Sequence, residues 1–327
     1  MKKGVLFLFG LLVTSLVYAQ RPILRFNSQG EFKIVQFTDI HYQPENPESK
    51  VSIELIKEVI REEQPDLILF TGDVVWAKPA YTVLDHVFDP VVNAKIPFAY
   101  IFGNHDDEYG KSRDQLMEYA QQKPYCLSVK GDKQLAGVGN FVLEIKNSKD
   151  ENAFLLYLLD SSDYSKVKNI GTYDWLKLNQ IEWYTKESKA YTEENKGTPY
   201  PALAFFHIAL EEFYTMCEVN KSKLIGNRKE RECNGFLNTG MFAAMRQAGD
   251  VMGIFVGHDH DNDYVGIHYD VALGFGRYSG GNTVYNNLGK NGCRVFQLKE
   301  GKREFKSYIR LLGGEILYPI HFPYSFN

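Results

Sequence analysis

The chain has 327 residues, of which 44% are apolar and 24% charged, and its formal net charge is −4. These values are ordinary for a soluble globular protein, and the length is sufficient to bury a large core. The small negative charge, with no dense run of Lys or Arg, argues against a nucleic-acid partner.

The first residues differ in kind from the rest. Lys2 and Lys3 give a basic start, residues 4–17 are almost wholly apolar, and residues 17–19 end in the small residue Ala19. This pattern predicts a signal peptide over residues 1–19 and an exported protein, periplasmic or extracellular. An uncleaved anchor helix is the alternative, but the apolar run is short for a span of about 20 residues. We expect residues 20–327 to form one domain, with its core at about 33–312 and no membrane span after cleavage.

Four cysteines, Cys126, Cys217, Cys233 and Cys293, remain after that cleavage. Exported proteins can hold disulfides, and four cysteines allow three complete pairings between which the sequence does not choose. Cys217 and Cys233 flank a polar stretch and are the best candidates for a bridge, whereas four free thiols are an equal alternative. None of the four has the spacing of a metal site.

In chain order, short apolar runs alternate with helical patterns. The apolar runs predict buried strands at 34–37, 67–70, 98–102, 154–159, 202–206 and 252–256. Between the first two runs, an apolar face and the stop at Pro65 predict a helix over 51–63. Further helices are predicted at 114–122, 174–189 and 239–248. The alternation indicates an α/β protein.

The second half changes character. Residues 265–273 and 293–298 read as strands separated by a loop rich in Gly and Asn, and 139–145 reads as part of a hairpin. We therefore expect two packed mixed β-sheets flanked by helices, a four-layer αββα sandwich. The polar segment 210–236 is either an insertion near the site or a solvated loop, and the loop is favoured.

Five polar clusters each follow an apolar run. They are Asp39-Ile40-His41, Gly72-Asp73, Gly103-Asn104-His105-Asp106, Phe206-His207 and Gly257-His258-Asp259-His260. Functional groups of α/β sheets gather outside the carboxyl ends of the strands, so the five clusters are expected to converge on one cleft.

The spacing within the clusters suits metal binding. Residues two apart in extended backbone point the same way, so Asp39 and His41 can hold one ion together. Asp73 has two carboxylate oxygens and can bridge two ions. Imidazole and carboxylate suit Zn, Fe, Mn and Co. Singly, each cluster has an ordinary explanation as a turn, a helix cap or a core histidine. The five together in this order make coincidence a poor explanation.

The order of these motifs, from about residue 33 to 260, resembles the calcineurin-like metallophosphoesterase superfamily. Further stretches at 234–236, 248–250, 257–263 and 274–276 resemble a purple-acid-phosphatase-like subgroup. The resemblance implies two metal ions. One ion would be held by Asp39, His41, Asp73 and His260, and the other by Asp73, Asn104, His207 and His258.

The resemblance also implies a role for His105 that is distinct from metal binding. His105 would face the phosphate as general acid or charge stabiliser. Purple enzymes carry a Tyr three residues after the bridging Asp, where this chain has Trp76, and they lack the histidine equivalent to His41. We therefore expect no purple colour, and the metals, Fe, Mn or Zn, stay unassigned.

Charge favours phosphate ester hydrolysis. Two divalent ions, two carboxylates and one hydroxide leave a net charge of about +1 before an anionic substrate arrives. A bound metal can lower the pKa of water from 15.7 to about 7, and ions about 3.5–4 Å apart can hold both nucleophile and phosphoryl oxygens. We therefore expect a metal-dependent hydrolase that cleaves a small phosphate monoester by in-line attack of metal-bound hydroxide. A phosphodiesterase or nucleotide hydrolase on the same site is an alternative, and a non-catalytic metal-binding or interaction protein is another.

Residues around these motifs have open roles. Asp106, Asp259, Asp261 and Asp263 are expected to support ligand histidines or to form turns. A Gly-rich loop carries Tyr278, Asn282 and Tyr285 and is either a rim of the cleft or a mobile surface loop.

Overall fold

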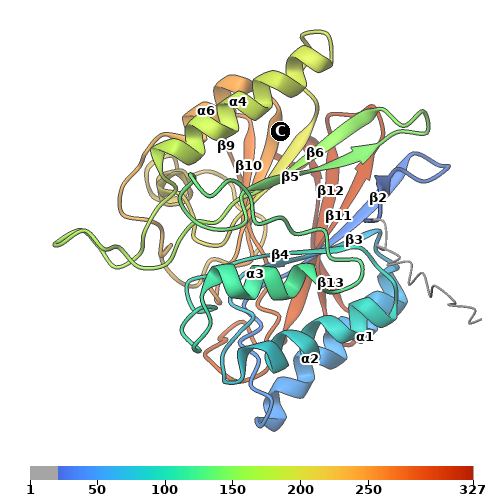
Figure 1. The fold of residues 1–327 in the computed structure, drawn as a ribbon. Coiled ribbons are helices and arrows are strands. Elements are labelled where there is room, and N and C mark those ends of the chain that lie inside the picture. Colours follow the sequence, from blue (N-terminus) through green and yellow to red (C-terminus); the bar gives the residue numbers. More distant parts are fainter. Residues whose placement is uncertain (1–20, 327) are drawn as a thin grey trace, which may run out of the picture.

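The computed structural model describes residues 21–326 and contains two β-sheets packed face to face (Figure 1). The first sheet has the order β1 (Leu24–Arg25), β5 (Phe141–Lys146), β6 (Asn152–Leu158), β7 (Ala202–Phe205), β8 (Val251–Val256), β10 (Val271–Phe275) and β9 (Val265–His268). The second has the order β13 (Ile316–Phe322), β12 (Phe305–Leu311), β11 (Gly292–Lys299), β2 (Glu31–Phe37), β3 (Leu67–Thr71) and β4 (Phe98–Ile101).

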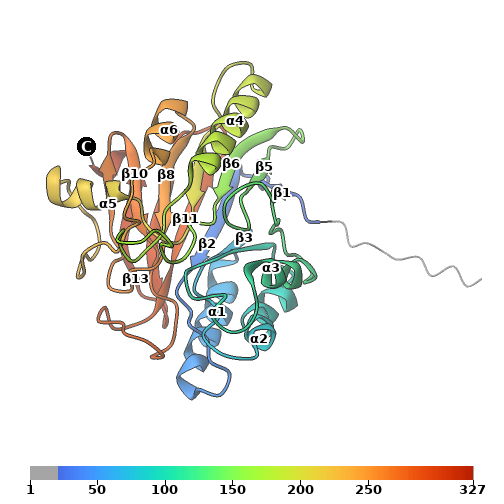
Figure 2. The same ribbon diagram turned by 60° about the vertical axis from the view of Figure 1, so that its left-hand side comes forward.

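Helices cover the outer faces of both sheets. They are α1 (Lys50–Glu63), α2 (Ala80–Asn93), α3 (Arg113–Gln121), α4 (Leu178–Glu194), α5 (Glu211–Tyr214) and α6 (Met241–Ala248). Figures 1 and 2 show α1, α2 and α3 on the side of the second sheet and α4 and α6 on the side of the first. The predicted fold class, two mixed sheets flanked by helices, is confirmed.

Three buried apolar clusters account for the four layers. One lies between the sheets and includes Leu69, Leu156 and Phe296. The second joins the other face of β2–β4 to α1–α3, and the third joins β6–β8 to α4 and α6. Strands buried on both faces need near-continuous apolar runs, which is why those runs were readable in the sequence.

The parallel pairs position the site. β2 pairs parallel with β3, and β3 with β4. In the other sheet β6, β7 and β8 pair parallel in turn. The carboxyl ends of these strands therefore lie at one edge of the sandwich, and the loops that follow them can meet.

The prediction of a single strand over 265–273 is wrong. The segment is a hairpin of β9 and β10, in which Val271 pairs with His268. Tyr269 and Asp270 at its turn both have positive φ, 44° and 64°, as a two-residue hairpin turn requires. In the sheet topology, β9 and β10 extend the sheet of β5–β8, while β11 pairs with β2.

Helix α2 and strands β12 and β13 had no sequence prediction. Helix α2 contains Pro90, and it buries Val83, Leu84, Val87, Phe88 and Val91 against the second sheet. Because proline removes a helical hydrogen bond, the pattern does not read as a helix. Helices α1, α3 and α6 start and end close to the predicted residues, whereas α4 is displaced toward the C-terminus.

The segment 210–236 is not a solvated loop. It begins with α5 and a π-helical turn, Thr215–Val219, and then runs along the loop that follows β8. Bridges join Ile225 to Val265 and Arg228 to Asn262. The segment therefore packs beside the loop that carries His258 and His260. This position agrees with the less favoured prediction, an insertion near the site.

All four cysteines are free thiols in the structure, so the Cys217–Cys233 bridge is not formed. Cys217 is buried, and its thiol donates a hydrogen bond to the Tyr264 hydroxyl over 3.4 Å. Among residues 21–326, none of the helices is both long and apolar enough to cross a bilayer. The predicted signal peptide lies outside the described residues.

Candidate metal centre

The predicted site residues lie in loops that directly follow parallel strands. Asp39 and His41 follow β2, Asp73 follows β3, Asn104 and His105 follow β4, His207 follows β7, and His258 and His260 follow β8. All of them except His105 are buried. The structure thus brings together the side chains that sequence order had separated by up to about 220 positions.

Four of these residues have backbones in the left-handed region. The φ angles are 55° at Asp39, 45° at His41, 52° at Asp73 and 76° at His258. Residues other than glycine rarely adopt such angles, and the conformation is typically retained where it aims a functional side chain. The strain at four positions of one cleft indicates that the loops are shaped for ligand placement.

Two glycines allow the loops to approach. A Cβ atom at Gly103 would lie 2.1 Å from Asp73 Oδ1, and one at Gly257 would lie 2.0 Å from Thr38 Oγ1. Contacts this short exclude a side chain, so glycine at these positions is a packing requirement of the site.

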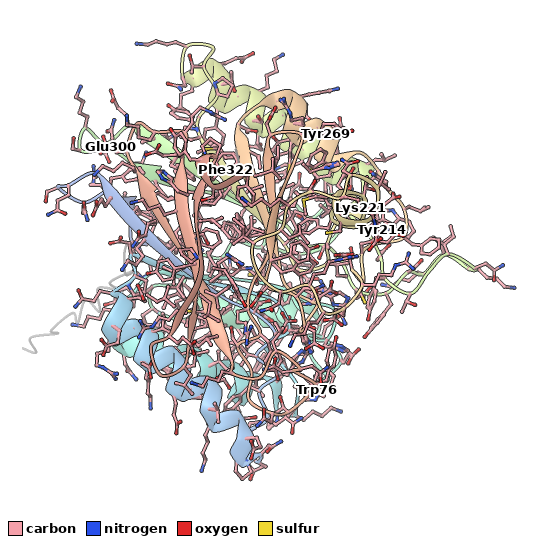
Figure 3. All side chains as sticks on the ribbon, turned by 180° about the vertical axis from the view of Figure 1, so that it is seen from behind. Trp76, Tyr214, Lys221, Tyr269, Glu300 and Phe322 are labelled. Carbon is pink, nitrogen blue, oxygen red and sulfur yellow. The ribbon has the colours of Figure 1, made fainter. Side chains whose placement is uncertain are left out.

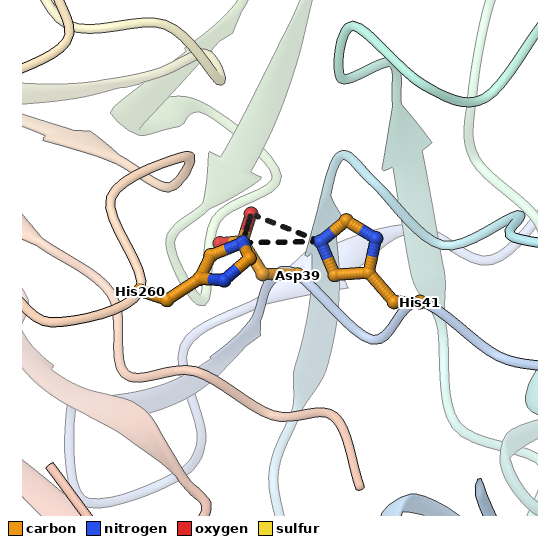
Figure 4. A group of neighbouring side chains, drawn as sticks. All are labelled: Asp39, His41 and His260. Atoms are coloured by element: carbon orange, nitrogen blue, oxygen red, sulfur yellow. Dashed lines mark hydrogen bonds and ion pairs between the residues drawn. The ribbon is translucent and has the colours of Figure 1, made fainter. Parts of the chain in front are cut away.

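Asp39, His41 and His260 form one group whose ligand atoms face each other (Figure 4). His41 Nε2 lies 3.1 Å from His260 Nε2 and 4.0 Å from Asp39 Oδ1. His260 Nε2 lies 3.6 Å from the same carboxylate oxygen. Three donors converging within these distances could hold one metal ion.

Asp73, His207 and His258 form a second group. His207 Nε2 lies 3.2 Å from Asp73 Oδ2, and His41 Nε2 of the first group lies 3.8 Å from the same oxygen. Asp73 Oδ2 therefore lies between the two groups, as a bridging ligand must. The geometry suits two cations that share one carboxylate.

Within residues 21–326, four buried atoms of the predicted ligands have no hydrogen-bond partner. One is Nδ1 of His41, and the other three are Asn104 Oδ1, His207 Nε2 and His258 Nε2. Buried polar atoms are seldom left unpaired, and each of these three is a usual metal donor. The residues present therefore fit two metal ions, although the individual ligand roles stay a prediction.

Backbone carbonyls fix two of the imidazoles. His207 Nδ1 lies 2.8 Å from the carbonyl oxygen of Thr71, and His260 Nδ1 lies 3.0 Å from that of Tyr285. A carbonyl can only accept, so each Nδ1 donates and each Nε2 is left as the atom that faces the metal position. Metal-binding histidines are commonly oriented in this way.

Both carboxylates stay ionised. Burial would raise the pKa of Asp39, but attraction to His207 and a hydrogen bond from His260 lower it to about 2. Burial acts in the same sense at Asp73, and its contacts with His207 hold that pKa well below the ordinary value. The site therefore presents two negative charges to an incoming cation at neutral pH.

The imidazoles divide into two kinds. Burial lowers the pKa of His41 and of His258 to about 3, so both are neutral ligands at neutral pH. Burial opposes protonation of His207 as well, yet Asp73 and Asp39 raise its pKa to about 9. A metal bound by His207 must replace that proton, so binding is expected to release it.

The sequence left the roles of four aspartates undecided. Their carboxylates accept hydrogen bonds from groups of the surrounding loops, and not from the ligand histidines. The Asp106 carboxylate accepts hydrogen bonds from the backbone N–H of Asp73 and Gly103, at 3.0 and 2.7 Å, and from two further residues. Burial and repulsion from Asp73 raise the pKa of Asp106 to about 6. The other three bind loop groups. Their partners are the Cys233 N–H for Asp259, Asn287 for Asp261, and Arg277 for Asp263.

The Gly-rich loop contributes one wall of the site. Tyr278 is buried and not a rim residue, whereas Tyr285 is 50% exposed and stacks on His260 with ring centroids 4.4 Å apart. Asn282 is exposed, and its side-chain amide donates a hydrogen bond to the Glu48 carboxylate over 3.1 Å, away from the predicted metal ligands. Only Tyr285 of the three forms a rim.

Several aromatic neighbours were not found from the sequence. Trp76 packs edge-on against His41 and His105, with centroid distances of 4.7 and 4.5 Å. Tyr173 packs against His258 at 4.2 Å. Trp76 was visible as a difference from the purple enzymes, but no local pattern pointed to Tyr173, because its contact depends on a long loop.

Fold and site together define a chain built around a dinuclear metal site. Residues 32–262 match the family described as calcineurin-like phosphoesterase, and the chain belongs to this family.

The relatives agree with the predicted subgroup. The chain is 36% identical to "Probable inactive purple acid phosphatase 29" of Arabidopsis thaliana, over 84% of this chain and 77% of the relative. It is 33% identical to "Probable inactive purple acid phosphatase 14" of the same plant, over 89% and 80%. Among solved structures, a dimetal phosphatase from Danio rerio superposes with a TM-score of 0.61 at 14% identity. The superposition covers 90% of this chain and 99% of that one, and it shows the shared fold.

Proposed function

We propose that the protein is a dinuclear-metal phosphoesterase that hydrolyses a phosphate monoester. One observation carries the proposal. The groups of Asp39 and Asp73 lie on either side of one carboxylate oxygen, and buried donor atoms of the predicted ligands have no hydrogen-bond partner among residues 21–326. Family membership supports the same chemistry.

The proposed ligand sets follow the two groups. Asp39, His41 and His260 would hold one ion, and His207, His258 and Asn104 Oδ1 the other, with Asp73 shared. Bound there, two cations would polarise a phosphoryl group and make a water molecule more acidic. Asp39 and Asp73 together offset only part of the charge of two divalent ions, which favours an anionic ester.

His105 stands apart from both groups and is the proposed proton donor. Its backbone N–H donates to Asp73 Oδ1 over 2.9 Å, which ties its position to the shared carboxylate. Its side chain is 24% exposed, so it can meet a substrate. A histidine in this position can protonate the leaving oxygen or balance its charge.

The word "inactive" in two relatives' names belongs to those proteins. In this chain the two predicted aspartates and four predicted histidines gather in two groups that could each hold a metal ion, which supports an active enzyme. The competing hypothesis is a non-catalytic metal-binding protein, and tight metal binding without ester hydrolysis is the result that would favour it.

The function is tested on the full chain loaded with Mn, Zn or Fe. We expect faster hydrolysis of p-nitrophenyl phosphate than of its bis ester. Faster hydrolysis of the bis ester would instead support a phosphodiesterase or nucleotide hydrolase, and no hydrolysis of either with any metal would contradict the proposal.

The residue roles are tested with two variants. His207→Ala removes a ligand, and we expect it to lose metal as well as rate. His105→Ala leaves the donors in place, and we expect it to keep its metal and lose turnover. Metal analysis of the two purified proteins separates the roles, and equal metal loss in both would contradict them.

We also propose that the protein is exported, on the basis of the pattern over residues 1–19. N-terminal sequencing of the protein from the extracytoplasmic fraction should begin at Gln20. A chain that retains Met1 in that fraction would contradict cleavage.

A further inference from the structure

Four side chains form a hydrogen-bonded chain behind the metal centre. His105 Nδ1 lies 2.9 Å from Glu108 Oε2, and the Tyr164 hydroxyl lies 3.1 Å from Glu108 Oε1. Asn104 Nδ2 lies 3.2 Å from the same hydroxyl. One phenol therefore contacts a proposed metal ligand, Asn104, and also the carboxylate that is bonded to the proposed proton donor.

The Tyr164 hydroxyl also lies 3.3 Å from His105 Nδ1, but the shorter contacts to the Glu108 carboxylate favour one arrangement of hydrogens. The Asn104 amide can only donate through Nδ2, so the Tyr164 oxygen accepts there and its O–H is directed to the Glu108 carboxylate. The other Glu108 oxygen then accepts from His105 Nδ1–H. Two atoms are left for the site: Asn104 Oδ1, which has no other partner, and His105 Nε2.

The loop that carries Tyr164 is held in place. The Arg113 guanidinium, in α3, donates to the carbonyl oxygen of Gly103 over 2.7 Å and to that of Ser162 over 3.3 Å. It thereby joins the loop after β4 to the loop after β6. Tyr164 also stacks on Tyr173, with ring centroids 5.8 Å apart. Its hydroxyl is thus presented to Glu108 from a braced position.

We propose that Glu108 and Tyr164 are a positioning pair that fixes the imidazole of His105 and the amide of Asn104. The proposal rests on the proposed function, because it assumes that His105 donates a proton to the leaving group. Glu108 accepts from Nδ1–H of the His105 imidazolium, so that Nε2–H is directed to the ester oxygen. As a water oxygen bonds to phosphorus, the bond from phosphorus to the ester oxygen breaks. That oxygen receives the Nε2 proton, and the ring is left neutral with its hydrogen on Nδ1.

A purely structural role is disfavoured by exposure. The Glu108 side chain is 38% exposed, and surface ion pairs of this kind contribute little to stability. We therefore expect Glu108→Ala and Tyr164→Phe to fold and melt like the parent protein, with their effect confined to catalysis and to the Asn104 metal position.

The kinetic test compares two aryl esters on the metal-loaded protein. Nitrophenolate leaves without a proton, whereas phenolate needs one. For Glu108→Ala we expect kcat on phenyl phosphate to fall about 100-fold, with a several-fold smaller loss on p-nitrophenyl phosphate and little change in KM. Tyr164→Phe should show the same selectivity at about tenfold, and it should release metal to a chelator about tenfold more readily.

Matched controls exist elsewhere in the chain. The Tyr191 hydroxyl, in α4, donates to Glu144 Oε1, in β5, over 2.9 Å. Glu144→Ala and Tyr191→Phe remove the same chemical pair away from the site and should leave both rates unchanged. Equal losses on the two esters in the Glu108 and Tyr164 variants would overturn the proposal.

A second measurement does not need activity. In zinc-loaded protein labelled with ¹⁵N-histidine, the neutral ring of His105, identified by its loss in His105→Ala, should carry its hydrogen on Nδ1. In Glu108→Ala the hydrogen should move to Nε2. An Nε2–H tautomer in the parent protein would overturn the positioning pair even if esters are hydrolysed. The expected tautomers without any hydrolysis would support the pair and contradict the proposed function.

Discussion

Buried carboxylates lie at both ends of the sandwich, and their negative charges are balanced in different ways. Figure 3 shows Trp76, beside the metal centre, and Glu300 at opposite ends of the protein. Glu63, at the end of α1, lines the same pocket as Lys299, the residue before Glu300 in the chain. Glu63 is only 6% exposed, and its carboxylate accepts hydrogen bonds from Lys33 Nζ over 3.0 Å, the Tyr308 hydroxyl over 2.7 Å and Arg310 Nη1 over 3.1 Å.

Asp39 and Asp73 have no such partners. Across residues 21–326, no lysine or arginine forms an ion pair with either carboxylate, and their ion-pair partners are imidazoles alone. Both oxygens of Glu63 are bonded, whereas the metal centre leaves donor atoms unpaired. The charge of Glu63 is therefore neutralised by side chains of the protein, whereas the carboxylates of the metal centre require cations from solution.

The largest expected effect is that of metal removal. With free metal 1,000-fold above its dissociation constant, binding to the folded state alone adds about 4 kcal/mol to the free energy of unfolding. A chelator should remove this contribution, which denaturant unfolding with and without chelator measures. Identical unfolding curves would break the comparison, because the carboxylates would then be balanced without cations.

Glu63→Ala should come second. It leaves Lys33 and Arg310 without their shared partner, and we expect a loss of about 2–3 kcal/mol in the free energy of unfolding with no change in metal content. Glu62→Ala is the matched control, because Glu62 is 48% exposed and pairs only with Arg61, so its loss should stay under about 0.5 kcal/mol. Equal losses in the two variants would contradict the role given to Glu63.

Tyr308→Phe removes one of the bonds to Glu63 and keeps the ion pairs. We expect a loss of about 1 kcal/mol in the free energy of unfolding, the usual contribution of a hydrogen bond. In the Glu63→Ala background the same substitution should have almost no effect. An undiminished loss there would show that the Tyr308 hydroxyl acts through another partner.

The smallest effect is that of acid on Glu63. Burial would raise its pKa, but bonds from Tyr308 and Lys33 lower it below the ordinary 4.5. A carboxyl with a lowered folded-state pKa stabilises the protein above pH 4.5, and this contribution fades as the pH falls through the folded-state pKa. In chelator-treated protein, the parent should lose stability over this range faster than Glu63→Gln. If the stabilities of the two proteins fell in parallel as the pH is lowered, Glu63 would not account for the loss of stability in acid.

The sequence by itself determined the class of fold and the order of the metal-binding motifs. Strands buried on both faces must be continuous apolar runs, and the polar residues that follow them, such as Asp73 after β3 and His207 after β7, mark the edge where ligands gather. These signals are local, so they can be read from neighbouring residues without a structure.

Only the tertiary structure decided which distant groups support the site. Three N–H groups of residues 73–75 bind Asp106, Tyr164 contacts Glu108, and β11 pairs with β2, and all of these contacts join segments far apart in the chain. Such contacts leave no periodicity, because they depend on where loops lie after the sheets have packed. The sequence therefore predicts which residues act as donors. Which atoms of those residues remain free for a cation depends on how the loops pack.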